Sequence, residues 1–221
     1  MKNRYNSGYS LVEIAIVLII IGLIIGGVLK GKDLIESARI KSVIAQVNGY
    51  RLAVSSFKEM FDALPGDFSA ASQQIDADLS NGNGNGQIEG SGMSAASESG
   101  QFWVHLAGAE LIAEPGRGQG NVLVFDGGVP SSALGGGFTV TYKDGKHWFV
   151  LGNASEGSNL TALLTPQQAK RLDAKMDNGN PLRGTILAVD GLDVPRGSCV
   201  NAAGQYNLLN KKPACVLYFE F

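Results

Sequence analysis

An uninterrupted apolar segment near the N-terminus constrains this 221-residue chain more than any other feature. It runs from Tyr9 to Leu29, reads YSLVEIAIVLIIIGLIIGGVL and contains a single charged residue, Glu13. At about 1.5 Å per residue, a helix over this segment is roughly 30 Å long, which matches the hydrocarbon thickness of a bilayer. Lys2 and Arg4 precede the segment, so the positive-inside rule predicts that the N-terminus stays cytoplasmic and that the rest of the chain crosses.

Two ordinary explanations of such a segment fit it poorly. A secretory signal peptide has a shorter apolar region followed by a small-x-small cleavage site, whereas here Lys30-Gly31-Lys32-Asp33 follows. A plain membrane anchor leaves Glu13 unexplained, because a carboxylate in an apolar helix costs about 2.5–3.5 kcal/mol on insertion scales. No Lys or Arg lies within the segment. We therefore expect Glu13 either to have a partner elsewhere or to face the lipid headgroups.

The residues at the start of the segment carry a family resemblance. Gly8-Tyr9-Ser10-Leu11-Val12-Glu13, placed between a short basic leader and an apolar helix, closely resembles the prepilin leader of type IV pilins and type II secretion pseudopilins. The resemblance implies cleavage after Gly8 by a membrane-embedded prepilin peptidase, N-methylation of the new amine on Tyr9, and retention of the apolar helix. Tyr9 is a departure, because mature chains of the family more often begin with Phe.

The same resemblance offers Glu13 a partner. Cleavage creates an amine on Tyr9 that stays basic after methylation, and in a helical stack of subunits this amine can neutralise Glu13 of a neighbouring copy. In a membrane or filament core the dielectric is low, so an unpaired carboxylate is costly and a paired one fixes the register of the subunits. The implied partners are further copies of the chain, prepilin peptidase, the membrane, and the inner-membrane assembly machinery of a pilus or a type II secretion system.

A heptad-like apolar stripe continues beyond the membrane segment. Its members follow one another at alternating intervals of three and four residues and are Ile40, Val43, Val47, Tyr50, Val54, Phe57, Phe61 and Leu64. Polar residues fall between them, and Pro65-Gly66 ends the pattern. The spacing predicts one helix from about Tyr9 to about Ala63, apolar all round in its first half and amphipathic in its second. The aromatic members favour a globular domain packed on one side over a soluble coiled coil.

The fold class that we expect is α+β, with a pilin-like long helix followed by a head that contains an antiparallel sheet. The expected organisation is a leader at 1–8, a transmembrane or filament-core helix at 9–29, an amphipathic half-helix at 30–63 and a globular head at 64–221. Predicted strands cover 121–125, 137–142, 146–151, 184–189 and 216–221, with Asp144-Gly145 as a hairpin turn. Predicted helices cover 101–112 and 166–176, the second capped by Thr165 with Pro166 in its first turn.

The two cysteines, Cys199 and Cys215, lie beyond the predicted membrane crossing, in a compartment that permits oxidation. A disulfide between them would close a loop of about 16 residues and contribute roughly 3 kcal/mol in the chain-entropy model. The family resemblance agrees, because pilins of this kind often carry a C-terminal loop bounded by a disulfide. The alternative is a pair of free thiols.

The segment from Asn81 to Glu89, NGNGNGQIE, has the spacing of a calcium loop. Oxygen-bearing side chains occupy every second position, in the order Asn81, Asn83, Asn85, Gln87 and Glu89; glycines separate the first four, and Ile88 separates the last two. Related pilin-like sequences carry more acidic versions, whereas here Asn replaces Asp three times and Gly92 occupies the position of the bidentate Glu. We expect weak calcium affinity unless Asp76, Asp78 or Glu98 joins the site, and the alternative is a plain glycine–asparagine turn.

Several functional classes find no support in the sequence. A net charge of −2 argues against nucleic-acid binding, which needs a basic face to displace counterions. His105 and His147 have no HExxH spacing, and no GxSxG elbow, phosphate-binding loop, dinucleotide fingerprint or cysteine–histidine signature occurs. We therefore expect no enzymatic activity and no contact with nucleic acid.

The leading hypothesis is a structural subunit of a type IV pilus-like filament. The precursor is expected as a single-pass protein of the bacterial cytoplasmic membrane, and the product as a periplasmic or extracellular filament. Two alternatives stay open: a pseudopilin that acts as a piston in type II secretion, and a membrane-tethered binding module that never polymerises.

Overall fold

A computed structural model describes residues 10–115, 123–155 and 158–221. Contacts between residues divide the chain into two compact units, Met1–Arg39 and Ile40–Phe221. The second unit, here called the head, contains every element apart from the first part of the long helix. Each unit is described by itself.

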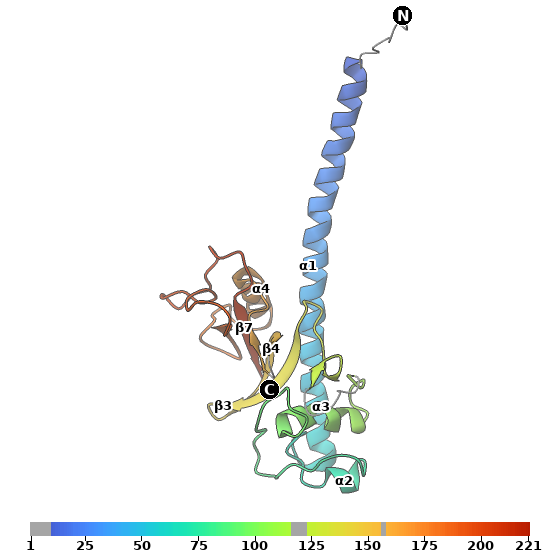
Figure 1. Cartoon of the computed structure of the whole chain (residues 1–221), viewed down its shortest axis with the longest axis vertical. Helices are drawn as coiled ribbons and strands as arrows, with labels where there is room; N and C mark the ends of the chain where they lie inside the picture. Colours follow the sequence, from blue (N-terminus) through green and yellow to red (C-terminus); the bar gives the residue numbers. More distant parts are fainter. Residues whose placement is uncertain (1–9, 116–122, 156–157) are drawn as a thin grey trace, which may run out of the picture. The chain divides into compact units, whose positions relative to one another are not determined.

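A single helix, α1, runs over Leu11–Phe61 (Figure 1). The Ser10 hydroxyl accepts a hydrogen bond from the Val12 N–H at 3.3 Å and caps its first turn. Asp62 ends the helix with a positive φ of 50°, three residues before Pro65. The predicted long helix is confirmed; its expected first residue, Tyr9, lies outside the described residues.

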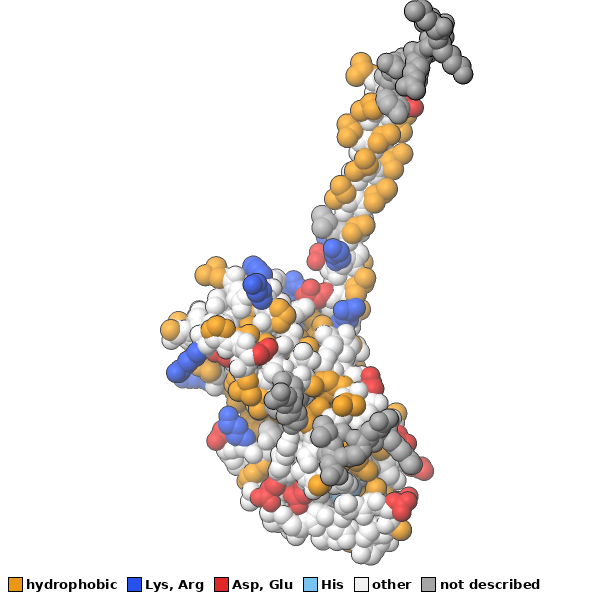
Figure 2. Space-filling view, viewed as in Figure 1, with side chains coloured by type: hydrophobic (Ala, Val, Ile, Leu, Met, Phe, Trp, Pro, Cys, Tyr) orange, Lys and Arg blue, Asp and Glu red, His pale blue; other side chains and the backbone are white. Residues whose placement is uncertain are grey.

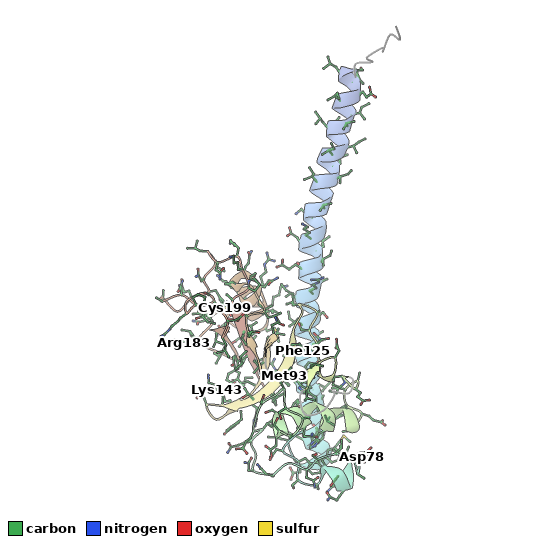
Figure 3. The ribbon with its side chains drawn as sticks, in the orientation of Figure 1. Asp78, Met93, Phe125, Lys143, Arg183 and Cys199 are labelled. Atoms are coloured by element: carbon green, nitrogen blue, oxygen red, sulfur yellow. A yellow bond between two sulfur atoms is a disulfide. The ribbon has the colours of Figure 1, made fainter. Side chains whose placement is uncertain are left out.

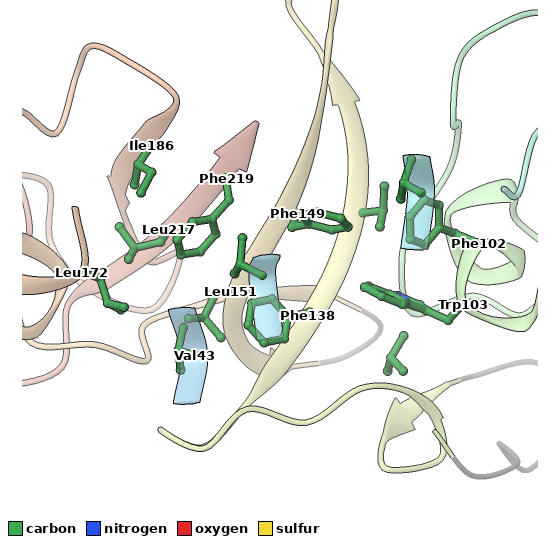
Figure 4. Packing of buried hydrophobic residues seen from close by; sticks show 14 of the residues in the cluster. Val43, Phe102, Trp103, Phe138, Phe149, Leu151, Leu172, Ile186, Leu217 and Phe219 are labelled. Atoms are coloured by element: carbon green, nitrogen blue, oxygen red, sulfur yellow. The ribbon is translucent and has the colours of Figure 1, made fainter. Parts of the chain in front are cut away.

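The predicted stripe is the face of α1 that enters the core of the head. Five of its members are buried, namely Ile40, Val43, Val47, Val54 and Phe57, and the other three pack against the same cluster. Figure 4 shows Val43 in the cluster with Phe138, Leu151 and Leu217 of the sheet. The amphipathic half of α1 is therefore an integral part of the head, as the spacing predicts.

An antiparallel sheet forms the centre of the head, in the strand order β3-β4-β7-β6. Its strands are β3 (Gly137–Lys143), β4 (Lys146–Ser155), β6 (Ile186–Asp190) and β7 (Cys215–Glu220), and β5 (Ser158–Thr161) pairs with the end of β4. A separate two-stranded parallel pair consists of β1 (Val124–Phe125) and β2 (Gly128–Val129). The antiparallel sheet and the long helix confirm the predicted α+β class.

Three short helices complete the head: α2 (Ala71–Gln74), α3 (Glu98–Gly108) and α4 (Pro166–Met176). Helix α4 begins and ends where the sequence predicts, because the Thr165 hydroxyl and the Gln168 side chain cap one another's backbone N–H groups. Helix α3 begins three residues before the predicted start, because the Ser97 side chain accepts a hydrogen bond from the Gly100 N–H.

Two strand predictions need correction. The strand expected at 121–125 is reduced to β1, with residues 121 and 122 outside the described residues. The strand expected at 184–189 begins only at Ile186, because the Asp177 carboxylate binds the backbone N–H groups of Thr185 and Ile186. The hairpin turn is confirmed, since Asp144 and Gly145 have φ values of 54° and 78°, as a type I′ turn requires.

The last strand is fixed directly to the long helix. The Arg51 guanidinium donates two hydrogen bonds to the Glu220 carbonyl oxygen, at 2.7 and 3.0 Å. Beside this contact the Phe221 ring stacks on Phe149, with 4.1 Å between the ring centroids. The Arg51 hydrogen bonds therefore hold the end of β7 against α1, and the ring contact holds the residue after β7 against β4.

Candidate functional site

The first part of α1 presents an apolar surface that stays exposed within the part of the chain that the structure describes. The helix is long and apolar enough to cross a membrane, and none of its most apolar 18-residue window is buried. Its exposed large side chains between Leu11 and Val28 are all aliphatic. Such a surface is costly in water, so it must lie in lipid or against other proteins.

Glu13 is the single acidic residue in the first turn of α1. The free backbone N–H groups of a helix N-terminus give it a positive partial charge, which favours a carboxylate at this position. The predicted processing residues, Gly8 and Tyr9, lie outside the described residues. The cleavage site and the amine that would pair with Glu13 therefore stay predictions.

The predicted calcium loop is folded around the carboxylate of Asp67. One carboxylate oxygen of this residue accepts hydrogen bonds from the backbone N–H groups of Gly84 and Asn85, at 2.7 and 3.0 Å. The other accepts one from Gly86 at 2.8 Å. Asp67 is buried and follows the helix stop that ends α1. The centre of the loop thus presents N–H donors to an internal anion.

The side-chain oxygens of the loop are also engaged. The amide oxygens of Asn83 and Asn85 each accept a hydrogen bond from the backbone N–H two residues later, and the Glu89 carboxylate accepts from both Asn side chains. Glu98 joins the loop, as the calcium hypothesis requires, but its two oxygens accept backbone N–H bonds from Asn83 and Glu89. The geometry is that of a well-satisfied glycine–asparagine turn.

The first candidate ligand of the loop, Asn81, is engaged with a residue outside the loop. Asn81 accepts from the Ser72 N–H through its amide oxygen. Within residues 10–115, 123–155 and 158–221, no group of three or more His, Cys, Asp or Glu side chains is placed to hold a metal ion. Amide side chains such as those of Asn81 and Gln87 are a further kind of calcium ligand, so the calcium site stays a prediction.

His105 connects this loop to the end of α1. The ring is fully buried on α3, where its Nδ1 accepts from the Gly66 N–H and its Nε2 lies 2.8 Å from the Ser80 carbonyl oxygen. Gly66 needs its glycine, because its φ is +86° and a Cβ would overlap the Glu98 carbonyl oxygen. The helix stop, the loop and α3 therefore form one connected structure.

The second histidine is likewise part of the packing. His147 lies on β4 with its ring centroid 4.9 Å from that of Tyr142 and 5.8 Å from that of Phe221. Both histidines are thus surrounded by aromatic or backbone groups rather than placed beside a nucleophile.

The predicted disulfide is confirmed. Cys199 and Cys215 are joined, with 5.0 Å between their Cα atoms, and both are fully buried (Figure 3 labels Cys199). Asp190 on β6 holds the start of the enclosed loop through hydrogen bonds from the Gly197 and Cys199 N–H groups. The disulfide ties the loop that follows Cys199 to the first residue of β7.

A buried polar pair fixes the same loop to α4. The Tyr206 hydroxyl donates to the Asp173 carboxylate at 2.8 Å, and the other carboxylate oxygen accepts from the Gly179 N–H. Burial, followed by the hydrogen bond to Asp173, raises the pKa of Tyr206, so the phenol stays protonated. The disulfide-bounded loop is therefore attached at Cys215 and at Asp173.

Sequence reasoning missed Asp67 and His105 as organising residues. Both bind backbone atoms of segments 17 and 39 residues away in the chain. Any residue can supply a backbone N–H, so such partners leave no pattern in the sequence. The Pro65-Gly66-Asp67 turn was the available signal, but it indicated only a helix stop.

Comparison with known proteins agrees with the N-terminal geometry. The family model described as the prokaryotic N-terminal methylation motif matches residues 3–29. No relative among curated proteins matches the chain. Among solved structures, the chain is similar to the major type IV pilin PilA1 from Clostridium difficile, at 13% identity and a TM-score of 0.39, over 84% of this chain and 96% of that one.

The methylation motif covers the basic leader and the apolar segment, and the structure places an exposed apolar helix over the part of that segment that it describes. The structural likeness is too distant to add to this. The N-terminal segment of this chain is therefore similar to the segments that carry the prokaryotic N-terminal methylation motif.

Proposed function

We propose that this protein is the structural subunit of a type IV pilus-like filament. The observation that carries the proposal is the exposed apolar first part of α1, which follows a prepilin-type leader and continues without a break into a folded head. An anchor alone needs no methylation motif. A subunit that must leave the membrane as a polymer needs a helix whose apolar surface is stable both in lipid and against copies of itself.

Assembly transfers the apolar surface of Leu11–Val28 from lipid to a bundle of like helices. Burial of apolar area is worth about 25 cal/mol per Å² relative to water, but lipid has already supplied most of this. Packing and polar pairing must therefore set the specificity. The Glu13 carboxylate, paired with the methylated amine on Tyr9 of a neighbouring copy, would provide the register.

The precursor would reside in the bacterial cytoplasmic membrane with its head outside the cytoplasm. The disulfide between Cys199 and Cys215 supports this location, because such bonds persist in oxidising compartments. Prepilin peptidase would cut after Gly8, and the inner-membrane assembly machinery would extract the mature chain into the filament. The heads would then form the filament surface.

N-terminal sequencing of sheared surface filaments tests this proposal. We expect a mature chain that begins at N-methyl-Tyr9, and we expect Gly8→Ala to block or sharply slow processing. Gly31→Ala is the matched control, since an added Cβ there meets no other atom and should leave processing unchanged. A functional protein that keeps its first eight residues would overturn the proposal.

Deletion of the gene and shearing of the cells separate the rival uses. A pseudopilin would be processed identically, but its deletion would stop the export of secreted proteins without removing a surface filament. A tether that never polymerises would stay in the membrane fraction after shearing.

A further inference from the structure

Charged side chains in the head are sorted by sign. Between Glu59 and Glu114 the sequence has nine carboxylates and no Lys or Arg. Between Pro166 and Pro213 it has seven cations and four aspartates. Figure 2 shows Lys and Arg gathered over the part of the head that carries α4, and Asp and Glu gathered toward the opposite end.

The cations of the basic region outnumber its aspartates by seven to four, and each aspartate accepts a hydrogen bond from a backbone N–H group of the fold. Asp173 accepts a hydrogen bond from the Gly179 N–H, and Asp177 accepts one from the Thr185 N–H. Asp190 and Asp193 accept backbone N–H groups of Cys199 and Ala162. All seven cations are exposed. The field outside this region is therefore positive.

Exposed leucines lie among these cations. Leu209 is 92% exposed, and Leu208 lines a groove of about 350 Å³ together with Lys170, Arg171 and Lys211. The loop that carries the leucines is held by the disulfide and by the hydrogen bond from Lys211 Nζ to the Leu208 carbonyl oxygen. We call this surface the basic end; it comprises Lys170, Arg171, Lys211, Lys212, Leu208 and Leu209.

The opposite end of the head combines a recess with carboxylates. The recess has a volume of about 600 Å³, and its apolar lining includes Phe61, Leu64 and Phe68. The polar side chains of Lys58 and Asp62 also line the recess. Met60, which precedes Phe61 in the sequence, is 58% exposed. We call this surface the acidic end; it comprises the recess and the exposed carboxylates of Glu59, Asp62, Asp76 and Asp78.

The two surfaces lie at opposite ends of the head: Figure 1 shows α4 at one end and α2, with the last turn of α1, at the other. Surfaces that differ from each other and lie apart on one subunit join copies head to tail, and such contacts generate open polymers rather than closed dimers. Opposite charge favours the encounter and sets which surfaces meet.

We propose that the basic end of one head docks on the acidic end of a second copy, with Leu209 entering the recess lined by Phe61, Leu64 and Phe68. The inference rests on the proposed filament and specifies how its heads bind one another. A basic surface alone would suit any polyanion. The matching acidic surface with an apolar recess on the same chain favours a second copy.

Cysteine cross-linking in assembled filaments tests the contact. The native cysteines are joined to each other, so Leu209→Cys with Asp62→Cys adds the two thiols that are available to cross-link. Because the contact is head to tail, each subunit should link to the next, and sheared filaments should give a ladder of covalent multimers on a non-reducing gel. Leu209→Cys with Lys143→Cys, at the exposed end of β3, is the control and should give no ladder.

Charge exchange provides an independent readout. Lys170→Glu with Lys212→Glu should lower the yield of sheared filaments by about tenfold, and adding Asp62→Lys with Asp78→Lys should restore it. Lys143→Glu makes the same kind of charge change outside the basic end and should leave the yield unchanged. The thermal midpoints of the Lys170→Glu/Lys212→Glu and Lys143→Glu variants should stay at the wild-type value, because these three positions are exposed.

Two results would overturn this inference while leaving the proposed filament intact. One is abundant filaments of the Leu209/Asp62 cysteine variant with no ladder beyond that of the control. The other is normal filament yield after Lys170→Glu with Lys212→Glu together with lost binding of heparin, which would assign the basic end to a polyanion. Absence of filaments from the wild-type chain would instead refute the proposed function.

Discussion

His105 accepts a hydrogen bond from the backbone N–H of Gly66, with 2.9 Å between its Nδ1 and the amide nitrogen. Its Nε2 lies 2.8 Å from the Ser80 carbonyl oxygen, so Nε2 carries the proton and the ring is neutral. A second proton, on Nδ1, would face the Gly66 N–H and leave that donor without an acceptor. The ring thus joins the helix stop to the Asn81–Glu89 loop only in its neutral form.

This arrangement predicts a loss of stability in mild acid. Burial lowers the pKa of His105, whereas an unfolded histidine takes up a proton near pH 6.5. Below this pH the unfolded state therefore binds more protons than the folded state, so the free energy of unfolding falls as the pH falls. The stabilisation by neutral His105 is fully present above this pH. The thermal midpoint of the detergent-solubilised full chain should decrease from about pH 7.5 to about pH 5.

Histidine variants check the assignment. Burial lowers the pKa of His147 as well, with a further contribution from Lys58, so part of the acid effect belongs to that residue. His105→Gln should destabilise the protein by about 1–3 kcal/mol at neutral pH and remove much of the acid dependence. His147→Gln should retain the part of the acid dependence that is due to His105. A wild-type midpoint that does not change over this range would contradict the role of His105.

Loss of the disulfide should destabilise the head by roughly 3 kcal/mol, because the bond closes a 16-residue separation. For a domain of this size that corresponds to a decrease in thermal midpoint of about 6–12 °C. Differential scanning calorimetry with and without reductant measures the change. Cys199→Ser with Cys215→Ser should reproduce the reduced midpoint and show no further response to reductant; equal midpoints for all samples would refute the contribution.

Replacement of Glu13 should separate processing from assembly. We expect Glu13→Ala and Glu13→Gln to be cleaved normally but to reduce filament yield by about tenfold or more, because neither can neutralise a charged amine in an apolar core. Glu13→Asp keeps the charge and should retain part of the yield. Immunoblots of cell and sheared fractions give both quantities, and abundant filaments of Glu13→Gln would show that charge pairing is not required.

Calcium binding to the Asn81–Glu89 loop should be weak, because the Asp67, Glu89 and Glu98 carboxylates already accept hydrogen bonds. A ligand at about 100 times its dissociation constant stabilises the folded state by about 2.7 kcal/mol, so a millimolar site requires very high calcium for a full effect. We expect a chelator to lower the thermal midpoint relative to excess calcium, and Glu89→Gln to abolish the difference. An identical thermal midpoint in both conditions would rule out calcium binding to this loop.

Local patterns in the sequence predicted their structures closely. Thr165, Pro166 and Gln168 set the start of α4 through contacts within four residues, and Asp144-Gly145 set the hairpin by its backbone preference. The apolar stripe on α1 predicted which face is buried, because its spacing repeats over several turns. The disulfide followed from the presence of two cysteines beyond a predicted membrane crossing.

Elements that depend on distant partners could not be predicted in this way. Helix α2 has four residues and no side-chain cap, and β1 pairs with β2 in strands of two residues each. The short β5 exists because it pairs with the end of β4. The Asp67 carboxylate organises its loop through backbone N–H groups, which any sequence supplies. Such features depend on the tertiary packing that brings the segments together.

The position of β7 in the sheet has a consequence for chains that are cut short. This strand is the last along the chain, yet it lies between β4 and β6 and is fixed to α1 through Arg51. A truncated product that stops before Cys215 would leave β4 and β6 each with an open edge and α1 without its polar contact. Incomplete chains would therefore present unpaired strand edges and be more open to proteases than the complete fold.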